Sequence, residues 1–411
     1  MSLNQLLKQK ALEIGFDLAG VAPLEVWQDL DFARKWVEQG YGGEMRYLEN
    51  PKRHDPRQVL ASARSVVCVG LVYNAPFPYS TEVAKTSASA KGWPASSRPD
   101  EAPVSRAWIS RYAWGQDYHQ VMRARLEDLR KAIENLAPST ETRVYVDTGP
   151  VVERAFARHS GIGWTGKNTC LISPSKGSWF FLGVVLTSLP IEPDLPAPDR
   201  CGSCTRCLDA CPTGALTEPH VMDASRCVAY FNIEVKGAIP QHYRAQIGAN
   251  LYGCDICQDV CPWNRTETLA VSSQPSPVSG QNTRKGFGRT GAATTKLPEL
   301  QPMEITLPAS TDPRNTEFGG ETGPSSARRF SLFNPPLDAL AQLSEEDFRR
   351  AFRHSPIKRP KYRGWLRNLC VVMGNSGDRR FIPKLEELSR HEDSIVREHA
   401  AWALSRLRKV P

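Results

Sequence analysis

The chain has 411 residues, of which 40% are hydrophobic and 23% charged, and its net charge is +8 at neutral pH. At roughly 100–200 residues per domain, this length predicts two to four domains. No stretch approaches the ~18 consecutive apolar residues of a membrane span, and the N-terminus lacks the pattern of a signal peptide. We therefore expect a cytoplasmic protein without a membrane segment. The positive charge favours a polyanionic partner but does not identify one.

The first 195 residues alternate helical and strand patterns. An amphipathic helix is expected over 117–137. Strands rich in β-branched and aromatic residues are expected over 64–74, 142–150 and 178–189. These patterns predict an α/β or α+β domain. Residues 80–103, rich in Ser, Ala and Pro, predict a solvated loop.

The most unusual segment of this domain is VDTGPVVERAFARHSGIGWTGKNTCLISP, residues 146–174. Asp147 ends an apolar strand, and a turn then leads into a helix that carries Glu153, Arg154 and His159. A helix N-cap and a functional acid are equally favoured for Asp147, whereas a solvated helix face is favoured over a ligand for His159. The glycines that follow would let the backbone approach a ligand closely: Gly161, Gly163 and Gly166. No GxGxxG motif supports a nicotinamide-binding unit.

Residues 196–265 hold the strongest chemical signal. The run CGSCTRCLDACP, residues 201–212, has the cysteine spacing of bacterial two-cluster ferredoxins. Cys227 follows alone, and a second run, CDICQDVCP, begins at Cys254. In such ferredoxins the fourth cysteine of each run binds the other cluster. This predicts two [4Fe-4S] clusters, one on Cys201, Cys204, Cys207 and Cys261, the other on Cys211, Cys227, Cys254 and Cys257. Zinc also accepts four thiolates, but the repeated spacing argues against it.

The other cysteines have no predicted role. Cys68 lies in an apolar strand pattern and Cys370 in an apolar helical pattern, so both are expected to be small buried hydrophobes. Cys170 is expected to begin a buried strand. The gap between Cys227 and Cys254 is longer than in a compact ferredoxin and predicts an inserted helix or loop.

Residues 266–330 are rich in Ser, Thr, Gly and Pro and predict a flexible low-complexity insertion. Helical patterns resume from 331, where Ser344 and Asp347 predict a capping box. Residues 377–409 predict two antiparallel helices that resemble a single HEAT-type pair and must dock on the preceding chain. One face of the last helix is apolar: Val396, Ala400, Ala403, Leu404 and Leu407.

Residues 349–367, RRAFRHSPIKRPKYRGWLR, mix basic and aromatic side chains. The basic residues are Arg349, Arg350, Arg353, Lys358, Arg359, Lys361, Arg363 and Arg367, and the aromatic ones are Phe352, Tyr362 and Trp365. Such a segment can hold phosphates and stack on splayed bases of an RNA loop. A solvated helical face with aromatic core contacts is equally favoured.

Several of these motifs, in this order, resemble the epoxyqueuosine reductase family: SRYAWGQDYH, VDTGPVVERAFARHSGIGWTGKNTCLI, CGSCTRCLDACPTGAL and YGCDICQDVCPWNR. The resemblance covers most of residues 1–265 and resumes in the C-terminal helices. It implies an α+β multidomain chain with a nitroreductase-like cobalamin-binding domain over 1–195, a ferredoxin-like double-cluster module over 196–265 and a HEAT-like, tRNA-binding helical domain over 331–411. The chain departs from the family pattern at residues 80–103 and 266–330.

The resemblance also implies an activity, the reduction of epoxyqueuosine to queuosine at the wobble position of tRNA, which is the last step of queuosine biosynthesis. Electrons would pass from an external low-potential reductant through the two clusters to cobalamin. Asp147 would be the proton donor, with a pKa raised by burial against corrin and substrate. Arg57, Lys167 and Ser173 match cobalamin-contacting positions, although ordinary surface charge is the alternative. We expect a monomer that binds the anticodon stem-loop.

Two other functions fit the same motifs. A corrinoid iron–sulfur reductase of a small molecule, similar to the reductive dehalogenases, shares the cobalamin and two clusters, but a basic helical tail would be superfluous to it. A plain electron carrier would use its flanking domains only to dock partners. Failure to bind a corrinoid would favour the carrier, and corrinoid binding without tRNA binding would favour the small-molecule enzyme.

Overall fold

The computed structural model describes residues 1–83, 105–265, 293–307 and 328–409. Its central sheet has the strand order β1-β2-β7-β4, with all neighbouring strands antiparallel. The strands are β1 (Leu18–Pro23), β2 (Ser65–Val72), β7 (Phe180–Thr187) and β4 (Thr142–Tyr145). The three strands predicted from the sequence are therefore confirmed. An antiparallel sheet with helices places this part of the chain in the α+β class rather than the α/β class.

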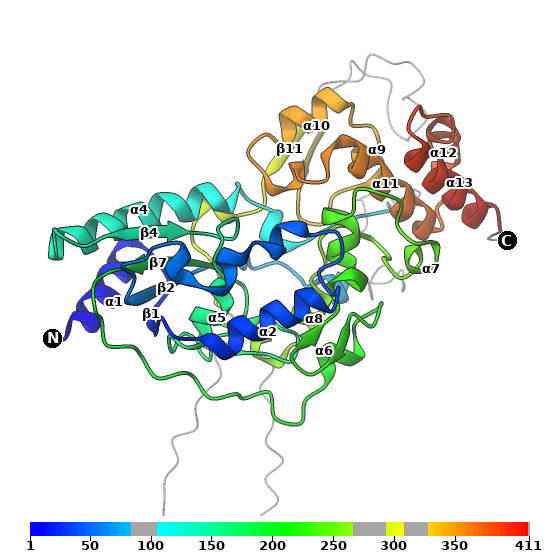
Figure 1. The fold of residues 1–411 in the computed structure, drawn as a ribbon. Helices are drawn as coiled ribbons and strands as arrows, with labels where there is room; N and C mark the ends of the chain where they lie inside the picture. Colours follow the sequence, from blue (N-terminus) through cyan, green and yellow to red (C-terminus); the bar gives the residue numbers. More distant parts are fainter. Residues whose placement is uncertain (84–104, 266–292, 308–327, 410–411) are drawn as a thin grey trace, which may run out of the picture.

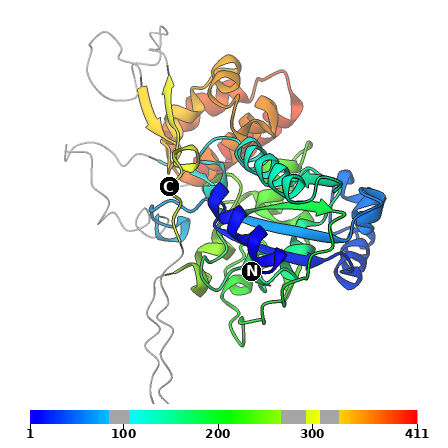
Figure 2. The same cartoon turned by 90° about the vertical axis from the view of Figure 1, so that its left-hand side faces the viewer.

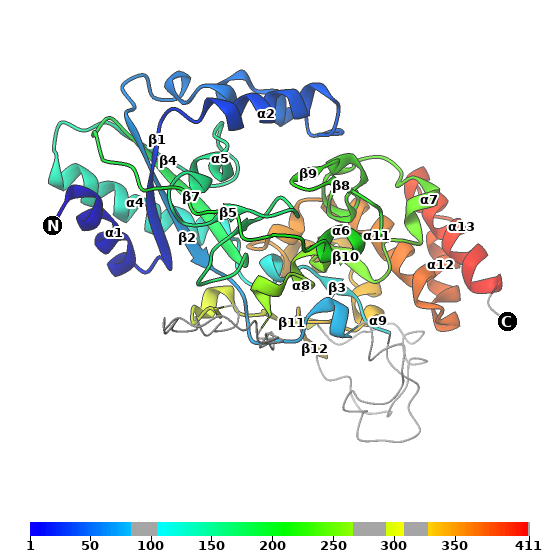
Figure 3. The same ribbon diagram turned by 90° about the horizontal axis from the view of Figure 1, so that it is seen from below.

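Helices cover both faces of this sheet (Figure 1; Figure 3). On one face lie α1 (Leu3–Ile14) and α4 (Tyr118–Leu136), and on the other α2 (Trp27–Glu38) and α5 (Glu153–Arg158). Because successive residues of a strand point to opposite faces, Val67 packs with α1 and α4 whereas Cys68 packs with α2 and α5. Every residue of β2 is buried as a result. Cys68 is thus a core residue, as expected.

The cysteine module lies between the sheet and the C-terminal helices (Figure 1). Its elements are α6 (Arg206–Asp209), β8 (Leu216–Glu218), β9 (Val221–Met222), α7 (Gln241–Arg244), β10 (Asn250–Tyr252) and α8 (Ile256–Asp259). A π-helical turn, η6 (Tyr230–Glu234), together with α7 and β10, fills the gap in which an insertion was predicted. β10 pairs in parallel with β3 (Trp108–Ile109), which connects the module to the first domain.

The C-terminal region is helical, as predicted. It contains α9 (Leu337–Ala341), α10 (Glu345–Ala351), α11 (Lys361–Ser376), α12 (Ile382–Leu388) and α13 (Ser394–Lys409). The capping box of Ser344 and Asp347 begins α10. The predicted apolar face of α13 is buried, and Cys370 of α11 is fully buried. Gly374 allows the two helices to approach, because a Cβ there would lie 2.8 Å from the Cα of Ala403. No helix in the described parts of the chain is long and apolar enough to cross a membrane.

The expectation of a flexible insertion over 266–330 is wrong for residues 293–307 and 328–330. Strand β11 (Glu304–Leu307) pairs antiparallel with β12 (Arg328–Ser331), and Figure 2 shows this hairpin beside the C-terminal helices. Leu300, Ile305 and Phe330 are buried in the cores of the two flanking domains. These isolated apolar residues give no periodic pattern, so the surrounding polar composition concealed them. The rest of the predicted insertion, and residues 84–103 of the predicted loop, lie outside the described residues.

Candidate active site

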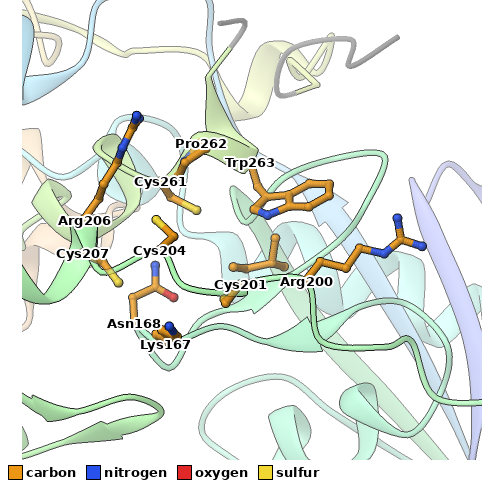
Figure 4. A pocket seen from close by; sticks show the side chains of 11 residues that line it. Lys167, Asn168, Arg200, Cys201, Cys204, Arg206, Cys207, Cys261, Pro262 and Trp263 are labelled. Carbon is orange, nitrogen blue, oxygen red and sulfur yellow. The ribbon is translucent and has the colours of Figure 1, made fainter. Parts of the chain in front are cut away.

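The first predicted cysteine set surrounds one cavity. Cys201, Cys204, Cys207 and Cys261 line a space of about 150 Å³. Figure 4 shows the sulfur atoms of Cys204, Cys207 and Cys261 turned toward it. Helices α6 and α8 contact each other, which brings Cys261 to the first run. Burial raises the pKa of Cys207 to about 11 and of Cys261 to about 12. Without a bound cation these are neutral thiols, and iron binding would release their protons.

The second predicted set is also brought together. Burial raises the pKa of the Cys254 thiol, and the neighbouring Cys227 and Cys211 raise it further. The pKa of Cys257 is raised by its hydrogen bond with Cys170, then by burial and by the nearby Cys254 and Cys227. Within the described residues, no three His, Cys, Asp or Glu side chains form a site for a single metal ion. The division of the eight cysteines between two clusters therefore stays a prediction.

A second, larger cavity of about 450 Å³ lies between the sheet and the cysteine module. Five of its thirteen lining residues are aromatic, namely Tyr73, Tyr112, Tyr118, Phe180 and Phe181. The lining also includes three charged side chains: Asp147, Glu153 and Arg154. Cys170 and Gln258 line it too, and Cys170 interacts with Cys257 of the module. The cavity thus connects the predicted acid to the second cysteine set.

Asp147 lies in the loop that follows β4. Helix α5 begins six positions later, at Glu153, with Val152 as its N-cap, so the N-cap interpretation of Asp147 is wrong. The φ angle of Asp147 is +56°, a left-handed conformation that is uncommon for a residue other than glycine and often marks functional loops. Its Oδ2 accepts a hydrogen bond from the Tyr118 hydroxyl at 2.7 Å and lies 3.2 Å from His119 Nε2.

The charge state of Asp147 differs from the expectation. Desolvation by the surrounding protein raises the pKa of its carboxyl, although 56% of the side-chain surface remains accessible. Hydrogen bonds from His119 and Tyr118 more than offset this effect, so the pKa lies below its usual value. The rise expected from burial against corrin and substrate stays a prediction, because the protein alone holds the carboxyl in its ionised form. The sequence did not predict that two donors would face the carboxylate.

Glu153 is a second acid in the same cavity. Its Oε1 atom is buried without a hydrogen-bond partner. Burial, with a further contribution from the nearby charge of Asp147, raises the pKa of Glu153 to about 7. The sequence indicated only that Glu153 belongs to a helix. The sequence placed Glu153 at the start of the predicted helix, six residues after Asp147, and this proximity could have indicated a second acid in the site.

The three residues predicted to contact cobalamin do not line this cavity. Arg57 forms an ion pair with Glu25 at 2.6 Å on the surface. Lys167 donates a hydrogen bond to the Gly202 carbonyl at 2.6 Å and lines the first cysteine cavity instead. Ser173 is buried, with its hydroxyl 3.4 Å from that of Ser175. Their role as cofactor contacts stays a prediction.

Other residues of the 146–174 segment have structural partners. Its two short strands, β5 (Trp164–Thr165) and β6 (Leu171–Ile172), form a hairpin. The room left by Gly163 and Gly166 is taken by Ile172 of this hairpin, since a Cβ at Gly163 would lie 2.2 Å from the Ile172 carbonyl oxygen. His159 bonds Asp29 through Nε2. Cys170 directly precedes β6 as expected, but its place between cavity and cysteine set was missed.

The basic segment 349–367 divides into buried and exposed residues. Phe352 and Trp365 are fully buried, and Arg367 is buried with its guanidinium donating to carbonyls of the cysteine module. These three are structural and cannot meet a base or phosphate. Most of the other basic residues form ion pairs with acids, namely Arg349, Arg350, Lys358, Arg359 and Arg363. Arg353 and Lys361 are exposed, and the described residues offer them no acidic partner.

An α+β domain joined to two sets of four cysteines defines an iron–sulfur oxidoreductase. Residues 200–264 match the family described as "4Fe-4S double cluster binding domain", and residues 53–148 match "Epoxyqueuosine reductase QueG". The curated epoxyqueuosine reductase of Xanthomonas campestris is 35% identical over 402 residues, which cover 97% of this chain and 94% of the relative. The chain belongs to the epoxyqueuosine reductase family.

Solved structures agree with this assignment. An epoxyqueuosine reductase crystallised with an epoxyqueuosine-modified tRNA-Tyr stem loop is 29% identical, with a TM-score of 0.73 over 98% of this chain and 90% of the other. The Bacillus subtilis enzyme, 29% identical with a TM-score of 0.72 over the same shares, is described with an aspartate catalytic loop swung out of the active site.

The raised pKa of Glu153 predicts a pH-dependent stability difference. The ordinary pKa is 4.5 and the folded value is about 7, so between these values the unfolded chain loses a proton that the folded chain keeps. The wild type therefore loses stability as pH rises through this window. We expect Glu153→Gln to be more stable than the wild type by up to roughly 3 kcal/mol above pH 7, with little difference near pH 4.5. Denaturant unfolding of Glu153→Gln and of the exposed control Glu346→Gln would measure this. A gap that does not change with pH would contradict the assigned pKa.

Proposed function

We propose that this chain reduces epoxyqueuosine to queuosine at the wobble position of tRNA, with electrons passing from an external reductant through two [4Fe-4S] clusters to cobalamin, and with Asp147 as proton donor. The observation that supports this proposal most is the second cavity, whose lining includes both Asp147 and Cys170, and Cys170 interacts with Cys257. The acid and the cysteine set thus adjoin the same space.

The proposed cluster ligands are the two sets of four cysteines, with Cys261 completing the first set and Cys211 the second. Their support is the shared cavity of the first set and the mutual proximity of the second. Each cluster carries one electron at a time, so two clusters can deliver the pair that removal of an epoxide oxygen needs. Burial of these thiols suits iron, which stabilises the thiolate form.

The second cavity has the composition expected of a corrin site. Its aromatic walls can pack on a large flat macrocycle, and the unpartnered Oε1 of Glu153 can accept a hydrogen bond from a bound group. When bound, cobalamin would supply a reduced cobalt that is a strong nucleophile. Arg57, Lys167 and Ser173 are retained as proposed contacts on the family resemblance alone.

Asp147 must carry a proton when it acts as donor. Because Tyr118 and His119 stabilise its ionised form, the loop must lose at least one of these hydrogen bonds, or become more desolvated, when substrate binds. The left-handed φ of Asp147 and its large exposure suit a loop that changes position. The description of the Bacillus subtilis relative, with its loop swung out, supports such movement.

The tRNA substrate accounts for the positive charge and the C-terminal helices. We propose the domain plan of a nitroreductase-like domain over 1–195, a ferredoxin-like module over 196–265 and a HEAT-like tRNA-binding domain over 331–411, in a monomeric cytoplasmic enzyme. The relative solved with a modified stem loop supports this partner. A reductase of a small molecule is the alternative, and it would leave the exposed basic residues of the tail without a purpose.

Replacement of Asp147 tests the proton donor. With cluster-loaded protein, cobalamin, a strong reductant and epoxyqueuosine-bearing tRNA under anaerobic conditions, the nucleoside should lose one oxygen, as measured by mass. Asp147→Asn should lower this rate by roughly 10²–10⁴-fold without loss of corrinoid binding. The exposed carboxylate of α4 provides a control, Asp128→Asn, which should react at the wild-type rate. An unchanged nucleoside with the loaded wild type would reject the tRNA substrate.

The proposed assignment of four cysteines to each cluster predicts which substitutions remove the same cluster. Cys201→Ser and Cys261→Ser lie in different runs but should each lose roughly half of the iron, and the double variant should lose no more. Combining Cys201→Ser with Cys211→Ser should instead remove nearly all of it. Iron content and electron paramagnetic resonance would measure this. The buried control Cys370→Ala should keep both clusters, and complete iron loss in the Cys201/Cys261 double variant would contradict the division.

Salt dependence tests the tRNA surface. Arg353→Gln and Lys361→Gln should each weaken binding of the stem loop and reduce the slope of log affinity against log salt by about 1. Arg349, which is also exposed but paired with Glu345, is the matched control, and its replacement by Gln should change the slope less. Equal slopes in all variants would place the tRNA elsewhere.

A further inference from the structure

A chain of hydrogen bonds extends from Asp147 to the C-terminal helices. Oδ2 of Asp147 lies 3.2 Å from His119 Nε2, and His119 Nδ1 lies 2.7 Å from Asp117 Oδ1. The other oxygen of Asp117 accepts a hydrogen bond from Lys358 Nζ at 3.0 Å. His119 therefore has a carboxylate oxygen at each ring nitrogen.

The position of His119 is firmly fixed. Asp117, which is 7% exposed, is the N-cap of α4 and accepts the backbone N–H of His119, while its own N–H donates to the His354 carbonyl at 2.7 Å. The imidazole stacks on Tyr118 with ring centroids 4.1 Å apart, and Tyr118 stacks on Phe181 at 4.3 Å. These contacts hold the ring between the two acids.

The charges around His119 favour its protonated form. Asp117 and Asp147 attract a proton. The cations near them are Lys358 and Arg359 of the C-terminal segment, and the nearby hydroxyls of Tyr118 and Tyr252 are neutral. Desolvation lowers the pKa of His119, but the hydrogen bonds with Asp117 and Asp147 raise it to about 9. The imidazolium is thus the main form at neutral pH, and 27% of its side chain is open to solvent.

The reaction needs a second proton. Conversion of an epoxide to an alkene and water consumes two electrons, which the external reductant supplies, and two protons. One carboxyl group can deliver only one proton before it must be reprotonated. The first proton goes to the epoxide oxygen as one C–O bond breaks, and the second goes to the resulting hydroxyl oxygen as it leaves as water.

We propose that His119 is the positioning residue that returns a proton to Asp147 within each turnover, with Asp117 holding its ring in place. Once substrate binding desolvates the Asp147 carboxylate and removes its hydrogen bond from Tyr118, the Nε2 proton passes to it, and solvent then reprotonates the imidazole. This inference rests on the proposed donor role of Asp147. It assigns to the Asp117–Tyr118–His119 stretch a function that its sequence alone did not suggest.

The pH dependence of the rate tests the relay. With saturating reductant and tRNA, wild-type kcat should be level near neutral pH and fall above about pH 9, where His119 loses its proton. In His119→Gln, solvent acid must reprotonate Asp147, so kcat should be roughly 10–100-fold lower at about pH 8 and recover as the pH falls, with KM for tRNA unchanged. Tyr118→Phe, which removes the other donor to Asp147, should keep the wild-type profile shape. Parallel profiles for the wild type and His119→Gln would overturn the relay.

A titration independent of activity completes the test. In the cluster-loaded protein, nuclear magnetic resonance of labelled histidines should give His119, identified by its absence in His119→Gln, a pKa of about 9. The value should fall toward the ordinary one near 6.5 in Asp117→Asn and Asp147→Asn. An ordinary pKa in the wild type would reject the relay. An inactive wild type that shows the raised value would reject the proposed function and not the charge pairing.

Discussion

The buried carboxylate of Asp255 holds the cysteine module against the sheet domain. It is 1% exposed, and it receives hydrogen bonds from Trp108 Nε1 at 3.0 Å, from the backbone N–H of Arg111 at 2.9 Å and from the Ser110 hydroxyl. A buried carboxylate is costly unless its oxygens are satisfied, so these donors must be present when the module docks. Since Asp255 lies between Cys254 and the helix that carries Cys257, this contact sets the distance between the second cysteine set and the cavity.

The C-terminal helices are fixed to the module by a similar arrangement on its other side. Asn368 of α11 donates to the carbonyls of Asn232 and Leu251, and Arg367 donates to three carbonyls around η6. Burial lowers the pKa of Arg367 to about 10, which leaves it charged at neutral pH. The cysteine module is thus held on both sides by satisfied buried polar groups, and these have little tolerance for displacement. A module held in this way would suit the proposed electron transfer to the adjoining cavity.

Local patterns predicted the features that depend on local sequence. Strand β2, helix α4 and the capping box at Ser344 follow from periodicity and end signals, and the cysteine spacing anticipated that Cys261 would join the first run. These local patterns failed where tertiary contacts determine the surroundings of a residue. Arg367 looked like one more surface cation, but it donates to carbonyls of a segment 130 or more positions away in the sequence. The surroundings of His119 and Glu153 could not be predicted from the sequence, because both depend on where the Asp147 loop lies.

The two acids of the cavity illustrate the same limit and its chemical consequence. Asp147 and Glu153 have nearly equal pKa values as free groups, but their surroundings shift them in opposite directions. Two donors face Asp147 and favour its ionised form, whereas Glu153 has an unpartnered buried oxygen that favours its neutral form. An ionised Asp147 also raises the pKa of Glu153, because two carboxylates in one cavity repel each other. Protonation of Asp147 by His119 would remove that repulsion, and the cavity would then hold two neutral acids when the substrate oxygen requires a proton.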